Sequence, residues 1–149
     1  WLIFHKAATD KDGMPNFWFE LGPEFISWGL GTWGENRGMM DVMRRRIIAR
    51  PDDFVRLVER LYKNGFSIGG NQWKKLPVPD AVPEVLRPLY LKKDIYISRN
   101  DARVADAMKP DIAEKVYRDF EVLMPVYKML HGCVDEAMNQ MDDETGGNV

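Results

Sequence analysis

Three glycines at positions 29–34, in the stretch GLGTWG, have the spacing G-x-G-x-x-G, which in dinucleotide-binding proteins forms a phosphate-binding turn. That turn needs a buried parallel strand before it, a helix directly after it, and an acidic residue that ends a second strand about 20 residues further on. Here the preceding segment reads as one arm of a hairpin, and the acidic pair beginning at Asp52 starts a helix. We therefore interpret Gly29, Gly31 and Gly34 as structural glycines that let a twisted strand bend.

Basic side chains that follow this stretch could bind an anion. Arginines occupy positions 37, 44, 45, 46 and 50. Successive residues of a helix turn by about 100°, so the three consecutive arginines cannot all contact one phosphate. Arg44 lies at the margin of an apolar stripe and is expected to be partly buried. Two interpretations stay open: salt-bridged or solvated arginines with their stems on apolar surface, or an anion site formed by Arg37 and Arg44 together with Lys93.

Tryptophans on either side of the glycines form a second set of candidate ligand-binding residues. Trp28 and Trp33, with Trp73 further along, could stack on a sugar or a base. Packing in the core is the alternative, and we expect it for at least two of the three. The candidate ligand-binding residues are thus Trp28, Trp33, Arg37, Arg44 and Lys93.

Other chemistry has little support in the sequence. His5 and His131 lie far apart and lack the spacing of a zinc site, so no metal site and no cofactor is predicted. The segment 10–13 begins like a calcium loop but lacks the later ligands, and a turn is the better interpretation. Nucleophile-elbow and P-loop motifs are absent. Asp101 and Asp106 could form an acid–base pair, but carboxylates on helix surfaces are common.

Aromatic residues are concentrated at the start of the chain, where eight lie within the first 33 residues. This skew favours strands. We expect three strands, 1–7, 16–21 and 24–30, in an antiparallel meander whose turns are 9–13 and 22–23. In the second strand Trp18 and Glu20 share one face, and the apolar residues around them share the other.

Helical spacing of apolar residues begins near position 35 and dominates the rest of the chain. Pro125 is expected to kink or interrupt the last helix. The remaining predicted elements are helices over 35–50 and 52–64, a short hairpin over 66–69 and 72–76, a strand over 94–99, a short helix capped by Asn100 or Asp101, and helices over 111–123 and 126–141.

Composition limits the classes of protein that fit. The chain has 149 residues with 45% hydrophobic and 30% charged residues, which is a globular balance and fits one domain over 1–141 with a disordered tail over 142–149. A net charge of −2 makes nucleic acid an unfavoured partner. No apolar run is long enough for a membrane helix. The single cysteine, Cys133, predicts a reducing, cytoplasmic location.

Several weak motifs, taken in order, carry a resemblance to a known family. An aromatic hairpin leads into the glycine stretch and then into MMDVMRRRIIARPDDF, and LYLKKDIYISR and FEVLMPVYKMLHG follow later. Together these segments, roughly residues 1–131, resemble the bacterial family called domain of unknown function 2461. The resemblance implies no assigned activity and a fuller N-terminal part than this chain carries, so the chain reads as the C-terminal part of a longer protein. It also draws attention to Gly29, Gly31, Arg44, Lys93 and Pro125.

The sequence as a whole predicts an α+β fold, a twisted antiparallel sheet with helices packed on one face. The function it favours is a non-enzymatic intracellular binding module, whose partner is an unknown small anion or a protein. That module would use the open sheet face or the glycine–tryptophan edge. The alternative is an enzyme that acts on a small phosphorylated or carboxylate substrate in a pocket lined by Arg37, Arg44 and Lys93. Whether the protein is an enzyme is left open at this stage.

Overall fold

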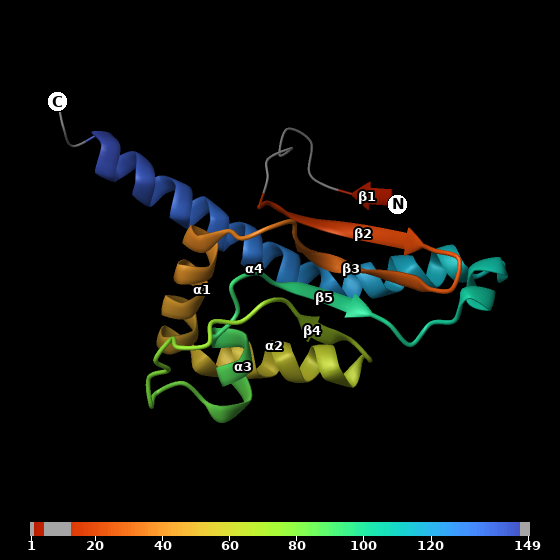
Figure 1. The fold of residues 1–149 in the computed structure, drawn as a ribbon, viewed down its shortest axis with the longest axis horizontal. Coiled ribbons are helices and arrows are strands. Elements are labelled where there is room, and N and C mark those ends of the chain that lie inside the picture. The colour runs from red at the N-terminus through yellow and green to blue at the C-terminus, as the bar shows by residue number, and fades with distance from the viewer. Residues whose placement is uncertain (1, 5–12, 147–149) are drawn as a thin grey trace.

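Five strands form one antiparallel sheet in the computed structural model, which describes residues 2–4 and 13–146 (Figure 1). The strands lie in the order β1-β2-β3-β5-β4. Every neighbouring pair is antiparallel. Their bounds are Leu2–Phe4 for β1, Pro15–Leu21 for β2, Ile26–Thr32 for β3, Ser67–Gly69 for β4 and Tyr96–Arg99 for β5.

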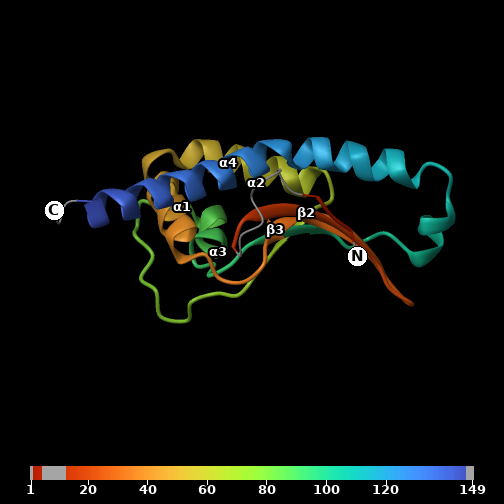
Figure 2. The ribbon, with the colours of Figure 1, turned by 90° about the horizontal axis from the view of Figure 1, so that it is seen from above.

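Helices cover one face of this sheet, with α4 and α2 forming the layer behind the strands (Figure 2). The predicted α+β class and its antiparallel sheet are confirmed. The helical elements are α1 (Arg37–Ala49), α2 (Pro51–Lys63), α3 (Arg87–Tyr90) and α4 (Ile112–Gly146), with short 3-10 helices η1 (Glu84–Leu86) and η2 (Val104–Met108).

The core lies between the sheet and the helices because the strands alternate. Phe17, Leu30 and Ile97 face the helices and are buried, whereas the residues next to them in each strand point to the opposite face. The main hydrophobic cluster joins these side chains to buried residues of all four helices, including Met43 of α1 and Leu130 of α4. The face of the sheet away from the helices is therefore left for polar, aromatic and glycine residues.

The glycine stretch lies within β3 and the turn after it, as a strand with antiparallel neighbours on both sides. Trp18 of β2 pairs with Gly29, and Gly29 pairs with Ser98 of β5. Helix α1 does not start at the last glycine, because Asn36 caps it by accepting the backbone N–H of Met39 at 3.0 Å. The structure confirms that this is not a dinucleotide-binding turn, which would need a parallel strand and an immediate helix.

The predicted hairpin over 66–69 and 72–76 is wrong. Strand β4 pairs with β5 through the Ile68–Ile97 register, and Gln72 makes only an isolated bridge to Lys92. The chain leaves β4 at Gly70, where φ is +115°. Asp94 then accepts the backbone and side-chain N–H groups of Asn71, so this segment is fixed to the chain just before β5. The prolines that follow remove the donors that a second hairpin strand would need.

The last helix is continuous through Pro125, so the expected interruption is wrong. Proline removes one backbone hydrogen bond in a helix. Pro125 is exposed, so the carbonyl four residues before it lies on the water-facing side of α4. On the opposite side Leu123, Val126 and Leu130 are almost fully buried, and their packing holds the helix together across the proline.

Several predicted boundaries differ from the observed ones. The third strand runs two residues further than expected, through Gly31 to Thr32, and α4 extends past the predicted end at 141 to Gly146. The short helix before α4 is η2, and its cap is Arg103, not Asn100 or Asp101. The predicted turn at 9–12, His5, most of the first predicted strand, and positions 147–149 of the predicted disordered tail lie outside the described residues.

Candidate functional site

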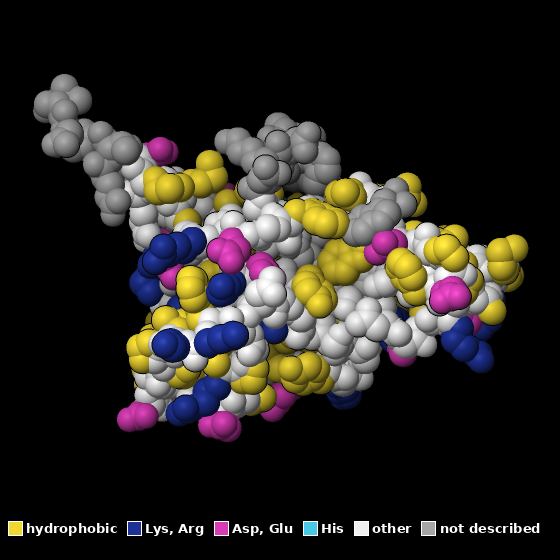
Figure 3. All heavy atoms as spheres, viewed as in Figure 1, with side chains coloured by type: hydrophobic (Ala, Val, Ile, Leu, Met, Phe, Trp, Pro, Cys, Tyr) yellow, Lys and Arg dark blue, Asp and Glu magenta, His cyan; other side chains and the backbone are white. Residues whose placement is uncertain are grey.

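A hollow of about 330 Å³ lies on the face of the sheet that no helix covers. Figure 3 views this face, and the Lys and Arg side chains visible in it gather mainly beyond the hollow, at the end of the molecule where α1 and α3 lie. The lining residues come from alternate positions of three adjacent strands and from the ends of β3 and β5. They are Asn16, Trp18, Glu20, Ser27, Gly31, Thr32, Trp33, Tyr96, Ser98 and Asn100. We call this site the open-face hollow.

Aromatic rings and glycines shape the floor of the open-face hollow together. A Cβ atom at Gly29 would lie 2.7 Å from Cη2 of Trp18, so the indole ring lies directly over the glycine. Tyr96 covers Gly69 in the same way, with its ring carbon Cζ 2.1 Å from where a Cβ would be. The two rings meet edge to face with centroids 6.4 Å apart. The glycines therefore leave space for two large rings against the backbone of the sheet.

Polar atoms without partners lie beneath and beside these rings. The hydroxyl of Ser98 and the Oδ1 atom of Asn16 are buried, and Ser98 is only 3% exposed. Neither atom makes a hydrogen bond among the described residues. Buried polar atoms are almost always paired. Glu20, at the other end of the hollow, also makes no hydrogen bond or ion pair within the described part of the chain. Unsatisfied groups thus point to a place where a ligand would form hydrogen bonds.

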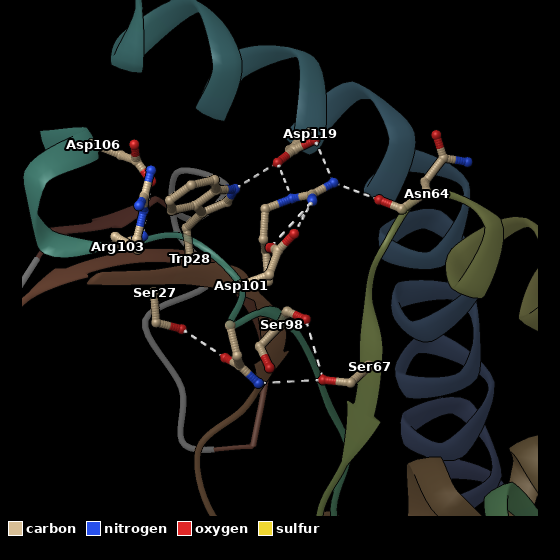
Figure 4. A network of polar contacts seen from close by, with 11 residues as sticks. Ser27, Trp28, Asn64, Ser67, Ser98, Asp101, Arg103, Asp106 and Asp119 are labelled. Carbon is tan, nitrogen blue, oxygen red and sulfur yellow. Dashed lines mark hydrogen bonds and ion pairs between the residues drawn. The ribbon is translucent and has the colours of Figure 1, made fainter. Parts of the chain in front are cut away.

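A chain of hydrogen bonds fixes one wall of the hollow (Figure 4). Ser27 donates to Oδ1 of Asn100 at 3.3 Å, and the amide group of Asn100 donates to the hydroxyl of Ser67 at the same distance. Ser67 then donates to the carbonyl oxygen of Ser98 at 3.3 Å. Because these contacts join β3, β4 and the end of β5, they hold the lining residues in place without using the Ser98 hydroxyl.

Trp28, one of the predicted ligand-binding residues, belongs to the helix-covered side. It is fully buried, and its indole N–H donates to Oδ2 of Asp119 in α4 at 2.8 Å. Asp119 also accepts a hydrogen bond from Nε of Arg99 at 2.6 Å. Nη2 of Arg99 donates to the backbone carbonyl of Asn64 at the end of α2. Figure 4 shows the side chains of Trp28 and Asp119 pointing toward one another. Trp28 therefore stabilises the core and does not line the open-face hollow.

Arg44 is also a structural residue, and its partial burial was expected from the sequence. Its Nε atom donates to the carbonyl of Tyr90 at 2.9 Å, Nη2 donates to the carbonyl of Lys92, and Nη1 pairs with Asp41 at 2.7 Å. Only 10% of its side chain is exposed. With its donors taken by the chain itself, Arg44 connects α1 to the segment before β5.

Arg37 and Lys93 have surroundings of their own, and the anion site predicted from them and Arg44 stays a prediction. Arg37 is exposed at the first turn of α1. The ammonium group of Lys93 lies 4.4 Å from the ring centre of Trp73 and 3.9 Å from a carboxylate oxygen of Glu35. None of these three basic residues lines the open-face hollow.

Trp33 is the one predicted ligand-binding residue that the structure places at the hollow. It follows β3, forms part of the rim and is 52% exposed. Gly34 beyond it has φ of +77° and open space around it, so it makes the turn toward α1. Sequence reasoning overlooked Trp18, Tyr96 and Ser98 as site residues. The alternation of β2 places Trp18 and Glu20 on one face, but the contribution of β5 depends on a long-range strand pairing.

A second, larger concavity of about 790 Å³ lies on the helix side, between β1, β2 and the first half of α4. Its lining is almost entirely apolar, with Glu121 as its only charged residue among those described. Leu2, Phe4, Tyr117 and Met124 contribute exposed apolar surface to it. We call it the apolar groove.

No metal-binding cluster of three or more His, Cys, Asp or Glu side chains occurs within residues 2–4 and 13–146. In that same part of the chain no helix has an apolar stretch of the length needed to cross a bilayer.

The fold and the site define a class of protein: an α+β domain whose antiparallel sheet is covered by helices on one face and carries a hollow of aromatic and polar side chains on the other. The model of the DUF2461 family, described as conserved hypothetical proteins, matches residues 1–129, and the chain belongs to this family. The resemblance seen in the sequence is thereby confirmed. No curated protein and no solved structure matches the chain.

Proposed function

We propose that this domain is a non-enzymatic binding module that takes a small molecule in the open-face hollow. The observation that carries the proposal is the buried, unpartnered hydroxyl of Ser98 in a hollow bounded by the rings of Trp18, Trp33 and Tyr96. Pockets that bind small molecules combine apolar or aromatic walls with a few polar groups that fix orientation. The hollow has this composition, and its volume of about 330 Å³ lies within the usual range for such pockets.

Binding is favoured over catalysis because the described residues that line the hollow hold a single carboxylate and no imidazole, amine or thiol. Glu20 is the only Asp, Glu, His, Lys, Arg or Cys among the described lining residues. General acid–base chemistry with one carboxylate would need a partner acid, base or nucleophile within hydrogen-bond reach. The alternative of an enzyme for a small anionic substrate gains no support, because Arg37, Arg44 and Lys93 lie outside the hollow. The free thiol of Cys133 is consistent with a cytoplasmic location in bacteria, which we include in the proposal.

A ligand screen tests this proposal directly. Thermal unfolding would be measured with a library of amines, sugars, nucleotides and carboxylic acids. A ligand at 100 times its dissociation constant stabilises the native state by about 2.7 kcal/mol, which raises the melting temperature detectably. We expect at least one class of compound to give a shift that Trp18→Ala abolishes.

Matched variants separate a loss of binding from a loss of fold. Trp73→Ala removes an exposed tryptophan outside the hollow and is expected to leave the shift unchanged. Trp33→Ala removes an exposed ring at the rim and is expected to weaken the shift. A library without a shift, or a shift that persists in both Trp18→Ala and Trp33→Ala, would contradict the proposal.

A further inference from the structure

The buried polar atoms without a partner in the open-face hollow, among the described residues, are the Oδ1 atom of Asn16, which accepts, and the hydroxyl of Ser98, which can act either way. Asn16 already uses its amide group to donate to the carbonyl of Met14 at 3.2 Å, so its Oδ1 atom is left to accept. The carboxylate of Glu20 only accepts when ionised. The Ser98 hydroxyl accepts or donates. A ligand that satisfies this set must supply N–H or O–H donors.

The charge of the hollow has a single sign. Glu20 is the only charged group among the lining residues, and none of those described is Lys, Arg or His. The ammonium group of Lys93 lies beside Trp73 and Glu35, and Lys93 is not among the lining residues. A ligand anion would therefore meet a carboxylate and buried acceptors with no compensating cation.

The rings that bound the hollow favour the same ligand charge. Trp18 and Tyr96 lie edge to face at the floor, and Trp33 stands at the rim. The face of an aromatic ring carries negative potential and attracts a cation. Asn16 and Glu20 are four residues apart on one face of β2, which separates them by about 13 Å. One cationic group therefore contacts only one of the two, and Glu20 is the charged one.

From these observations we propose that the ligand of the open-face hollow is a small organic cation, a protonated amine or guanidinium attached to an apolar or aromatic body. The body lies on Trp18 and Tyr96, and the cationic group pairs with the carboxylate of Glu20. This inference rests on the proposed binding function, and it reverses the anionic ligand predicted from the arginines.

The test compares three compounds of nearly equal shape and different charge. Phenethylamine is cationic, 2-phenylethanol is neutral and 3-phenylpropanoate is anionic at pH 7. Binding would be followed by NMR titration of the ¹⁵N-labelled protein. We expect phenethylamine to bind about tenfold more tightly than 2-phenylethanol. We expect 3-phenylpropanoate to bind more weakly than either.

A pair of variants shows whether the charge preference comes from Glu20. In Glu20→Gln the affinity for phenethylamine is expected to fall to that for 2-phenylethanol, whose own affinity stays unchanged. Glu24→Gln removes an exposed carboxylate that is close in sequence but does not line the hollow, and it is expected to change neither affinity. N-acetyl-lysine methylamide presents the same cation as a protein side chain. Tighter binding of this probe than of phenethylamine would still support a cation and would assign it to a partner protein.

The results that would contradict the cationic ligand differ from those that would contradict the binding function. If 2-phenylethanol or 3-phenylpropanoate binds as tightly as phenethylamine, and Trp18→Ala weakens that binding, the hollow is a ligand site but the proposal of a cationic ligand is wrong. The proposal of a cationic ligand is also wrong if only sugars or anions from the screen bind, and Trp18→Ala weakens their binding. If no compound depends on Trp18 or Trp33, the binding function itself is wrong.

Discussion

Arg44 and Arg99 each connect secondary-structure elements, at two different places in the molecule. Each sends guanidinium donors to backbone carbonyls of another element and pairs with a carboxylate on a helix. A planar guanidinium with five donors suits this role better than a lysine would. Arg44 looks like a ligand-binding residue in the sequence, but the donors of both arginines are used to connect secondary-structure elements.

Replacing Arg44 by Met is expected to destabilise the fold. The carbonyls of Tyr90 and Lys92 would lose their partner in a buried place, and we expect a loss of about 3 kcal/mol in the free energy of unfolding. Urea denaturation measures this change. Arg45→Met is the control, because about half of the Arg45 side chain is exposed and its contacts to α4 lie at the surface, so its cost should stay below about 1 kcal/mol. Equal costs for the two variants would contradict the structural role of Arg44.

Asp119→Ala should be among the most destabilising single changes at a polar residue. The variant leaves the guanidinium of Arg99 and the indole N–H of Trp28 without their shared acceptor in the core, and we expect a cost of about 3–5 kcal/mol. Asp101→Ala removes the other carboxylate near Arg99, 3.3 Å away but well exposed, and should cost less than about 1 kcal/mol. Chemical denaturation measures the free energy of unfolding of both variants. A loss below about 1 kcal/mol for Asp119→Ala would contradict this role of Asp119.

At the scale of elements, the glycines of β3 allow the sheet to close tightly. A Cβ atom at Gly29 would lie 2.0 Å from the carbonyl oxygen of Ile97, so β3 and β5 would have to separate. We expect Gly29→Ala to cost about 3 kcal/mol or more. Gly34→Ala meets no neighbouring atom and suffers only from its positive φ, so its cost should be about 1 kcal/mol. Thermal unfolding ranks the two variants, and the reverse order would be inconsistent with the β3–β5 pairing.

The pKa of Asp106 provides a test at the element η2. A hydrogen bond from Lys109, together with one from the backbone N–H of Arg103, lowers the pKa of Asp106 from its ordinary value of 3.8 to about 2. Because the folded pKa is depressed, the stability that these contacts contribute is present above about pH 4 and is lost as the pH falls toward 2. In Lys109→Met, NMR titration should find the pKa of Asp106 moved up toward 3.8. A pKa that stays near 2 would show that Lys109 is not its main cause.

The sequence predicts many of the secondary-structure elements, and the predictions that are wrong share a physical cause. The alternation of β2, the acidic first turn of α2 and the antiparallel setting of Gly29 follow from local spacing, and all three are observed. The partner of β4 could not be inferred locally, because β5 lies beyond a long proline-rich loop. For the same reason Tyr96 and Ser98 cannot be recognised as neighbours of Trp18 from local spacing. The sequence predicts that the glycines bend a strand past tryptophans, whereas Gly29 instead accommodates the ring of Trp18.

At the scale of the whole molecule, the two sides of the sheet have different roles. The covered side holds the core, the Arg99–Asp119 ion pair and the apolar groove, whereas the open side holds the hollow with its unpartnered acceptors. Helix α4 runs along the entire sheet on the covered side (Figure 2). Binding on the open side would therefore leave the core undisturbed.

The four described tryptophans allow a direct test of this division, because they lie in different environments. The measurement is an NMR titration that follows each indole N–H signal while a ligand found by the screen is added. The open-face account predicts that the signals of Trp18 and Trp33 move, while those of Trp28 in the core and Trp73 outside the hollow stay in place. Shifts confined to Trp28, Trp73 or the apolar groove, with Trp18 unmoved, would contradict it.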